Sequence, residues 1–134
     1  MGEFQGYCWP GNSVWIDYLN GRARDFWSSL YSYDIFNGTS SLFHIWNDMN
    51  EPSVFSEREG TLPKTAKHML DDKDGTIVMH RDVHNAYGVF MTRASYNGIL
   101  RREKKIDERI RPFILTRSSY FGTQKYAAKW TGDN

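Results

Sequence analysis

The stretch HIWNDMNEPSVF, residues 44–55, follows an apolar run with two carboxylates and a proline. Residues 42–48 show the alternation of a β-strand, and this alternation places Trp46 and Asp48 on the same face. Asp48 comes at the end of the strand, and Pro52 interrupts the strand soon afterwards because proline has no N–H to donate. The sequence therefore predicts a short apolar strand that carries an ionisable group at its carboxyl end.

The rest of the chain alternates between predicted helices and strands. Asn20 is a good N-cap for a helix that reaches about residue 33, and a longer helix is predicted over residues 82–102. Further strands are predicted over residues 113–117 and 127–130. The remaining predicted segments are a loop over residues 1–20, a hairpin that joins residues 67–70 to 76–79 through 72–75, and a short helix or turn over 121–126. Strands that alternate with helices indicate an α/β fold with a parallel sheet.

Polar or ionisable side chains follow three of the predicted strands, namely Asp48, Arg117 and Asp133. In parallel α/β folds, functional sites form where the carboxyl ends of the strands meet. Partial burial raises the pKa of a carboxyl group, whereas a cation such as Arg117 lowers it. Two carboxyl groups in opposed environments suit glycoside hydrolysis, which needs one ionised and one protonated. Spacing alone leaves structural capping as the alternative role for each aspartate.

The composition of the chain argues against several kinds of protein. The 134 residues suffice for one core, and a net charge of +1 gives no reason to expect a nucleic-acid partner. The single cysteine, Cys8, rules out an intrachain disulfide framework. No apolar run is long enough to span a membrane and no signal peptide is visible, so we expect no membrane partner.

The aromatic residues and two of the histidines each allow two interpretations. The five Trp, eight Tyr and eight Phe side chains can fill a core or line an aromatic cleft. His80 and His84 have the spacing of helical metal ligands, but no third ligand is obvious, so capping or packing is their expected role. The sequence therefore predicts neither a metal site nor another cofactor.

Three motifs in order along the chain point to a known family. WNDMNEPS at residues 46–53 resembles the nucleophile signature of glycoside hydrolase family 31. RPFILTRS at residues 111–118 resembles the strand that bears the family's sugar-binding arginine. WTGDN at residues 130–134 is similar to the second signature of the family, which carries the acid/base, and WPG at residues 9–11 is also similar. The chain is identified as a member of this family by these motifs, and the resemblance extends over essentially the whole chain.

The resemblance implies the fold and the roles of several residues. Residues 1–134 would be an incomplete fragment of a catalytic (β/α)8 TIM barrel, roughly from the end of its third strand to its sixth. Asp48 would be the nucleophile of a retaining α-glucosidase, and Asp133 would be the general acid and then the base. Arg117 would bind sugar hydroxyls, and Glu51 would support the loop or the arginine. The residues expected to wall the glucose site are Trp46, Met49 and Trp130.

Within the family, the resemblance is greatest to the neutral α-glucosidases of the endoplasmic reticulum, the glucosidase II group. It rests on YCWPG at residues 7–11, on residues 46–55, and on HRDVHN at residues 80–85. It implies a glucose-terminated oligosaccharide or N-glycan as substrate, a regulatory β subunit as partner, and the lumen of the endoplasmic reticulum as location. The sequon that begins at Asn37 is compatible with a secretory location.

A complete barrel of this kind takes about 250 residues, which is more than this chain provides. An open slice of a barrel exposes two strand edges, so we expect the isolated chain to be inactive. The alternative is a non-catalytic fragment that acts as a carbohydrate-binding or interaction module. Turnover of an aryl α-glucoside by the isolated chain distinguishes the two.

Overall fold

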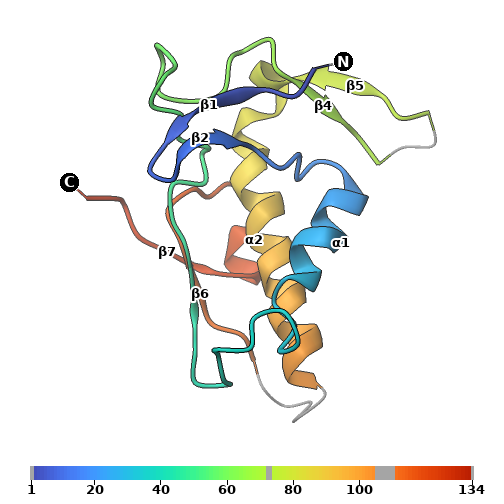
Figure 1. The fold of residues 1–134 in the computed structure, drawn as a ribbon, viewed down its shortest axis with the longest axis vertical. Helices are drawn as coiled ribbons and strands as arrows, with labels where there is room; N and C mark the ends of the chain where they lie inside the picture. Colours follow the sequence, from blue (N-terminus) through green and yellow to red (C-terminus); the bar gives the residue numbers. More distant parts are fainter. Residues whose placement is uncertain (1, 72–73, 105–110, 134) are drawn as a thin grey trace.

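The long helix α2 (His80–Lys104) is the central element of the fold. The computed structural model describes residues 2–71, 74–104 and 111–133. Helix α1 (Gly21–Ser29) packs along one side of α2, and a small parallel sheet lies on another side (Figure 1). No helix within the described ranges is both long enough and apolar enough to cross a membrane.

The parallel sheet contains three strands in the order β3 (Ile45–Asn47), β6 (Ile114–Thr116) and β7 (Ala128–Lys129). Asn47 is the partner of Thr116 between β3 and β6, and Thr116 is the partner of Lys129 between β6 and β7. Because all three strands run in the same direction, their carboxyl ends lie at one edge. The prediction of a parallel α/β sheet is confirmed for these strands.

Helix α2 covers one face of this sheet. The side chains that point toward α2 are the buried ones, Asn47, Ile114 and Thr116, none more than 4% exposed. Trp46 points the other way and is 61% exposed. The shared face predicted for Trp46 and Asp48 is therefore open in this structure. The described strands form no closed barrel, and their assignment to positions three to six of a barrel stays a prediction.

Two antiparallel hairpins accompany the parallel sheet. Strands β1 (Gln5–Cys8) and β2 (Gly11–Val14) form the first, which makes the prediction of a loop over residues 1–20 wrong. Gly11 has a φ of 100°, which allows the two-residue turn to close, and the short polar strands lack clear alternation. The second hairpin, β4 (Lys67–Met69) with β5 (Ile77–Met79), is confirmed. Residues 72–73 of its predicted turn lie outside the described residues.

Several element boundaries differ from the predictions. Asn20 caps α1 as expected, because its side chain accepts hydrogen bonds from the N–H groups of Arg22 and Ala23 at 3.0 and 3.3 Å. The helix nevertheless ends at Ser29, where turns begin. The strand predicted over residues 42–48 is shorter too: Leu42 is 84% exposed, and the regular ladder covers only Ile45–Asn47.

The carboxyl-terminal segments are also shorter than predicted. The strand over residues 127–130 reduces to Ala128–Lys129, and the short helix over 121–126 reduces to a 3₁₀ turn, η1 (Thr123–Lys125). The predicted ends of these elements were placed where the apolar and aromatic side chains stop. In the structure the elements end where hydrogen bonding to neighbouring elements stops. Helix α2, by contrast, is confirmed and begins two residues earlier than predicted.

The hydrophobic core lies between α1, α2 and the two hairpins. Tyr18 makes edge contacts with Trp27 and Tyr87, with ring centroids 5.5 and 5.3 Å apart. Each such buried ring contributes about 1.5–3 kcal/mol to the free energy of folding. The other members of the buried cluster are Leu19, Val54, Leu62 and Ala94.

Helices α1 and α2 approach closely at Gly98. A Cβ added to Gly98 would lie 2.7 Å from the backbone oxygen of Ser28 and from a ring carbon of Tyr31. Near this point Trp27 Nε1 donates to Ser95 Oγ at 2.9 Å, and Ser28 Oγ donates to the carbonyl of Ala94 at 2.8 Å. The glycine permits these interhelical hydrogen bonds.

Replacing Gly98 by alanine is expected to destabilise the protein by about 1–3 kcal/mol, because the new methyl group overlaps the α1 backbone. In an unhindered helix, replacing glycine by alanine would stabilise the helix by about 1 kcal/mol. A loss of stability would therefore show that the methyl group meets the α1 backbone. Thermal unfolding measures it. Gly38→Ala is the matched control, since nothing lies within 4 Å of a Cβ there. A Gly98→Ala variant as stable as the parent would contradict the packing described.

Candidate active site

The chain turns sharply where β3 ends. Asp48 follows the strand directly, and its Oδ1 accepts a hydrogen bond of 2.9 Å from the N–H of Met49. Met49 has a φ of 55°, the left-handed region that residues with a side chain rarely adopt. A backbone of this kind costs about 1–3 kcal/mol and is typical of functional sites. The turn presents Asp48 at the carboxyl edge of the sheet.

Arg117, the first residue after β6, lies between two carboxylates. Its Nη1 is 3.3 Å from Oδ1 of Asp48. Its Nε and Nη2 donate to Oε1 and Oε2 of Glu51 at 2.9 and 3.2 Å. The contact with Glu51 uses two parallel hydrogen bonds, a geometry that fixes the plane of the guanidinium group. One end of Arg117 is therefore anchored on Glu51 while the other reaches Asp48.

The charges of this cluster reinforce one another. Burial raises the pKa of Glu51, but the hydrogen bonds and charge of Arg117, together with Ser53, outweigh burial and leave that pKa below its ordinary value. The hydrogen bond to Glu51 in turn raises the pKa of Arg117, with further contributions from the charges of Asp48 and Asp133. The site thus holds a permanent cation next to ionised Glu51.

Ser53 completes the contact between Glu51 and Arg117. Its hydroxyl donates to Oε2 of Glu51 at 2.9 Å and accepts from Nη2 of Arg117 at 3.3 Å. The sequence reasoning did not assign a role to this serine. Ser53 is the last residue of the WNDMNEPS motif, but serine is common in turns next to proline, so its contact with Glu51 could not be predicted from the motif.

Asn50 lies beneath the site and joins the loops that carry Asp48 and Arg117. Its side chain is 2% exposed, donates to Thr116 Oγ1 at 2.9 Å, and accepts from the N–H of Ser118 at 2.9 Å. A Cβ on Gly88 of α2 would lie 2.6 Å from the carbonyl oxygen of Asn50, so the loop rests directly on the helix. The role of Asn50 was also not predicted from the sequence, because only the fold brings its side chain next to Ser118.

Two tryptophans lie close to the candidate aspartates in the sequence, Trp46 two residues before Asp48 and Trp130 three residues before Asp133. The rings of Trp46 and Trp130 have centroids 5.5 Å apart and an interplanar angle of 64°. Both rings retain solvent exposure, Trp46 the more so. Met49 and Asp48 line a small cavity of about 210 Å³ that also borders Trp27. Aromatic faces next to carboxylates are a suitable surface for a sugar ring.

The predicted site residues are brought together to different degrees. Asp48, Glu51 and Arg117 make direct contacts, and Trp46 contacts Trp130. Asp133 is exposed and connects to the cluster through its charge, which acts on Arg117. The last residue of the second signature, at position 134, lies outside the described residues.

A polar cavity of about 400 Å³ lies next to Glu51 and Arg117. Glu51 and Arg117 border it together with His84 of α2 and Lys129 of β7. The other lining residues are Asn85, Ser118, Ser119 and Thr131. This cavity therefore connects the carboxyl edge of the sheet with the first turns of α2.

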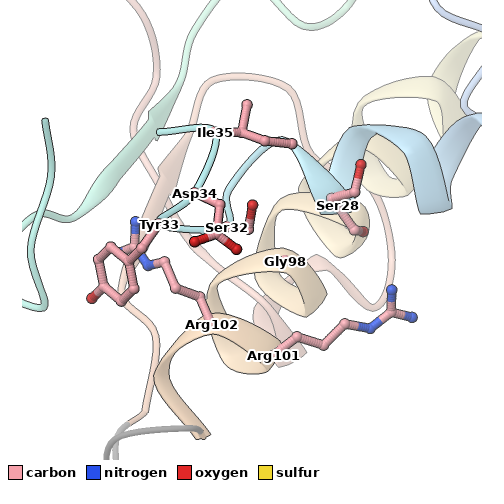
Figure 2. A pocket seen from close by; sticks show the side chains of 9 residues that line it. Ser28, Ser32, Tyr33, Asp34, Ile35, Gly98, Arg101 and Arg102 are labelled. Carbon is pink, nitrogen blue, oxygen red and sulfur yellow. The ribbon is translucent and has the colours of Figure 1, made fainter. Parts of the chain in front are cut away.

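Another cavity, of about 450 Å³, lies away from these residues, between the end of α1 and the last turns of α2 (Figure 2). Arg101 and Arg102 border it from α2, and Tyr33 borders it from the turns that follow α1. The guanidinium group of Arg102 lies over the ring of Tyr33, 4.6 Å from its centroid. None of the predicted site residues lines this cavity.

His80 and His84 do not face an empty metal site. Nε2 of His80 is 2.8 Å from Nδ1 of His84, and Nδ1 of His80 is 2.9 Å from Nε2 of His68. Within the described parts of the chain, no group of three or more His, Cys, Asp or Glu side chains is arranged to hold a metal ion.

The whole chain, residues 1–134, matches the family described as the glycosyl hydrolases family 31 TIM-barrel domain. The chain belongs to glycoside hydrolase family 31. A probable glucan 1,3-alpha-glucosidase of Oryza sativa subsp. japonica is 45% identical over 132 residues, which are 98% of this chain and 13% of the relative. The chain thus spans about an eighth of that family 31 protein.

Solved family 31 structures share the fold. The Tris-bound crystal structure of a glucosidase II alpha subunit is 47% identical, has a TM-score of 0.87, and matches 99% of this chain and 14% of its own. A heterodimeric complex of an ER glucosidase II catalytic subunit with the binding domain of its regulatory subunit is 48% identical, with a TM-score of 0.85, and matches 98% of this chain and 13% of its own. The resemblance inferred from the motifs is confirmed.

Glu51→Gln is expected to reduce stability in a pH-dependent way. The folded pKa of Glu51 is lowered, so its carboxylate stabilises the fold above its ordinary pKa, and this contribution is lost as the pH falls through the lowered value. The melting temperature should fall by about 2–4 °C at pH 7, and the difference from the parent should shrink toward pH 3.

Glu59→Gln is the matched control for Glu51→Gln. Glu59 pairs with Lys64 at 2.7 Å on the surface, with a side chain that is 58% exposed, and such pairs contribute little. A Glu51→Gln variant whose melting temperature differs from that of the parent by the same amount at pH 7 and pH 3 would contradict the charge assignment.

Proposed function

We propose that this chain forms part of a retaining α-glucosidase that acts by double displacement. The observation that carries the proposal is the arrangement of Arg117 between Asp48 and Glu51 at the carboxyl edge of the parallel sheet. It supplies an ionised carboxylate at the place where α/β folds bind substrate. The polypeptide that holds this chain within a whole barrel is called the complete enzyme below.

Asp48 is the nucleophile in this proposal. Nη1 of Arg117 lies 3.3 Å from Oδ1 of Asp48 and orients the carboxylate that attacks C1 of the glucose. Asp133 gives its proton to the leaving oxygen, and a covalent glucosyl ester forms on Asp48. Asp133 then removes a proton from water, which displaces Asp48 and restores the original configuration. Retention requires the two carboxyl groups to stand about 5–5.5 Å apart during the reaction.

Glu51 has a supporting role. Its two hydrogen bonds to Arg117 occupy the Nε edge of the guanidinium group, so Arg117 can bind sugar hydroxyls near Asp48 without collapsing onto it. The carboxylate is already engaged by Arg117 and Ser53, which makes it a poor nucleophile. Trp46, Met49 and Trp130 wall the glucose site beside this cluster.

The names of the relatives support a proposal for the substrate class and the location. The name of the rice relative specifies glucan 1,3-alpha-glucosidase, and the solved neighbours are alpha subunits of glucosidase II. We infer a terminal α-linked glucose on an oligosaccharide, with an N-glycan as the physiological carrier. The heterodimeric ER complex supports a regulatory β subunit as partner and the lumen of the endoplasmic reticulum as location. Asn37 is exposed, which suits a glycosylated sequon.

Two variants of the complete enzyme test the roles of the aspartates. Asp48→Gly should lower turnover of an α-glucoside by more than about a thousandfold while leaving substrate binding intact. With α-glucosyl fluoride and azide, Asp48→Gly should give β-glucosyl azide, because azide attacks from the vacated face. Asp133→Gly should give α-glucosyl azide, because azide there displaces Asp48 from the glucosyl ester. Full activity of Asp48→Gly, or the same anomer from both variants, would overturn the assignment.

The isolated chain of 134 residues is expected to show no turnover of an aryl α-glucoside, since it supplies only part of a barrel. The same assay on the complete enzyme is the control. Robust turnover by the isolated chain would refute its dependence on the rest of a barrel. Sugar binding without turnover by the complete enzyme would favour the alternative of a non-catalytic carbohydrate-binding module.

A further inference from the structure

Four side chains form a continuous row of hydrogen bonds that ends at a cavity which Arg117 also lines. Nδ1 of His68 lies 2.7 Å from Oδ1 of Asp17, and Nε2 of His68 lies 2.9 Å from Nδ1 of His80. Nε2 of His80 lies 2.8 Å from Nδ1 of His84. His68 and His80 are almost completely buried, at 3% and 1% exposure. We call Asp17, His68, His80 and His84 the histidine row.

Asp17 fixes the direction of the hydrogen bonds in the row. Its Oδ1 also accepts from the N–H of Leu19, and its Oδ2 accepts from the N–H of Met69, so both oxygens act as hydrogen-bond acceptors. Nδ1 of His68 must therefore carry a hydrogen. A neutral imidazole has one N–H and one lone pair, so each ring in the uncharged row donates from Nδ1 and accepts at Nε2. This leaves a lone pair on Nε2 of His84.

A single added proton reverses this pattern. When Nε2 of His84 takes up a proton, its Nδ1 proton can pass to Nε2 of His80, and the Nδ1 proton of His80 can pass to Nε2 of His68. The row then holds one extra positive charge, on His68 next to the Asp17 carboxylate. Each ring now donates from Nε2. Nε2 of His84 has changed from a hydrogen-bond acceptor into a donor.

The His84 end of the row faces the predicted site. His84 lines the polar cavity of about 400 Å³ that Glu51 and Arg117 also line. Its Nδ1 is occupied by His80, so Nε2 is the atom left to interact there. Glu51 holds Arg117 through both of its oxygens, and a new donor in this cavity competes with Arg117 for that carboxylate.

We propose that the histidine row is a proton-controlled positioning device for the site, in which His84 is a positioning residue that acts through Glu51 and Arg117. In the uncharged row, His84 leaves the Glu51–Arg117 pair undisturbed. In the charged row, His84 becomes a donor and draws Glu51 away from Arg117, which loosens the arginine beside Asp48. The proposal rests on the proposed function, because the effect of the histidine row is measured as a change in α-glucoside turnover.

The surroundings of His80, in the middle of the row, disfavour a charge on its ring. Burial, and then the neighbouring rings of His68 and His84, lowers the pKa of His80 to about 4. Tyr87 packs beside His68 and His80, and burial, with the charge of Asp17, raises the pKa of its hydroxyl, which keeps it neutral. Among the other titratable groups, Glu3 and Lys67 line a cavity with Asp17 and His68, and Arg81 and Asp82 follow His80 in the sequence. Glu51, Arg117 and Lys129 line the cavity at His84.

The test is the pH profile of kcat/KM for an aryl α-glucoside, measured on the complete enzyme. His84→Asn keeps a polar group near Nδ1 but cannot take up a proton, so the acid limb should move to lower pH by about one unit. Asp17→Asn removes the anion that stabilises the charged row and should give the same shift. The double variant should shift no further than either single variant, because both interrupt one row.

The matched control is His44→Asn. His44 is an exposed histidine that contacts Phe113 outside the row, and its loss should leave the profile unchanged. An unchanged acid limb in His84→Asn, or additive shifts in the double variant, would overturn the proposal. If the Asp17→Asn variant does not fold, the pH profiles of His84→Asn and His84→Gln test the proposal instead, because His84 lies at the open end of the row. Failure of the proposed function is distinguishable, since there the parent enzyme would show no turnover at all.

Discussion

The guanidinium group of Arg117 between Asp48 and Glu51 is the interaction on which the site depends. The guanidinium group contacts both carboxylates, through a single contact with Asp48 and two parallel hydrogen bonds to Glu51. Without the cation, Glu51 would lose the hydrogen bonds and the charge that hold its pKa below its ordinary value. With it, Glu51 stays ionised and holds the guanidinium group through two hydrogen bonds, and Asp48 makes a single contact with the same group.

The fold holds this interaction through short elements rather than long ones. Parallel pairing of β3 with β6 sets Asp48 and Arg117 at the same edge, since Asn47 and Thr116 are register partners. Asn50 then joins the two loops from below, and Gly88 lets α2 support them. Burying the polar side chain of Asn50 is tolerable only because its hydrogen-bonding groups find partners. Stability and positioning therefore depend on the same few contacts.

The sequence predicts the parallel sheet, α2 and the contact partners of Arg117, because alternation, helical spacing and the family motifs are local signals. It misses the contacts that only the fold creates. Ser53 and Asn50 carry no periodic signal, yet both fix the loop around Glu51. The β1–β2 hairpin was missed because its strands are short and polar and its turn depends on the positive φ of Gly11. The spacing of His80 and His84 predicted a capping or packing role, but it could not identify their partner His68, which lies on another element.

The central claim, that Asp48 is the group that Arg117 leaves free to attack the sugar, is tested most directly by trapping the intermediate. A fluorinated glucosyl fluoride, which forms the glucosyl ester faster than water breaks it down, is allowed to react with the complete enzyme. Fragmentation spectra of the labelled peptide then locate the sugar. The account predicts a label on Asp48. A label on Glu51 would contradict it, and so would turnover with inversion and no covalent label.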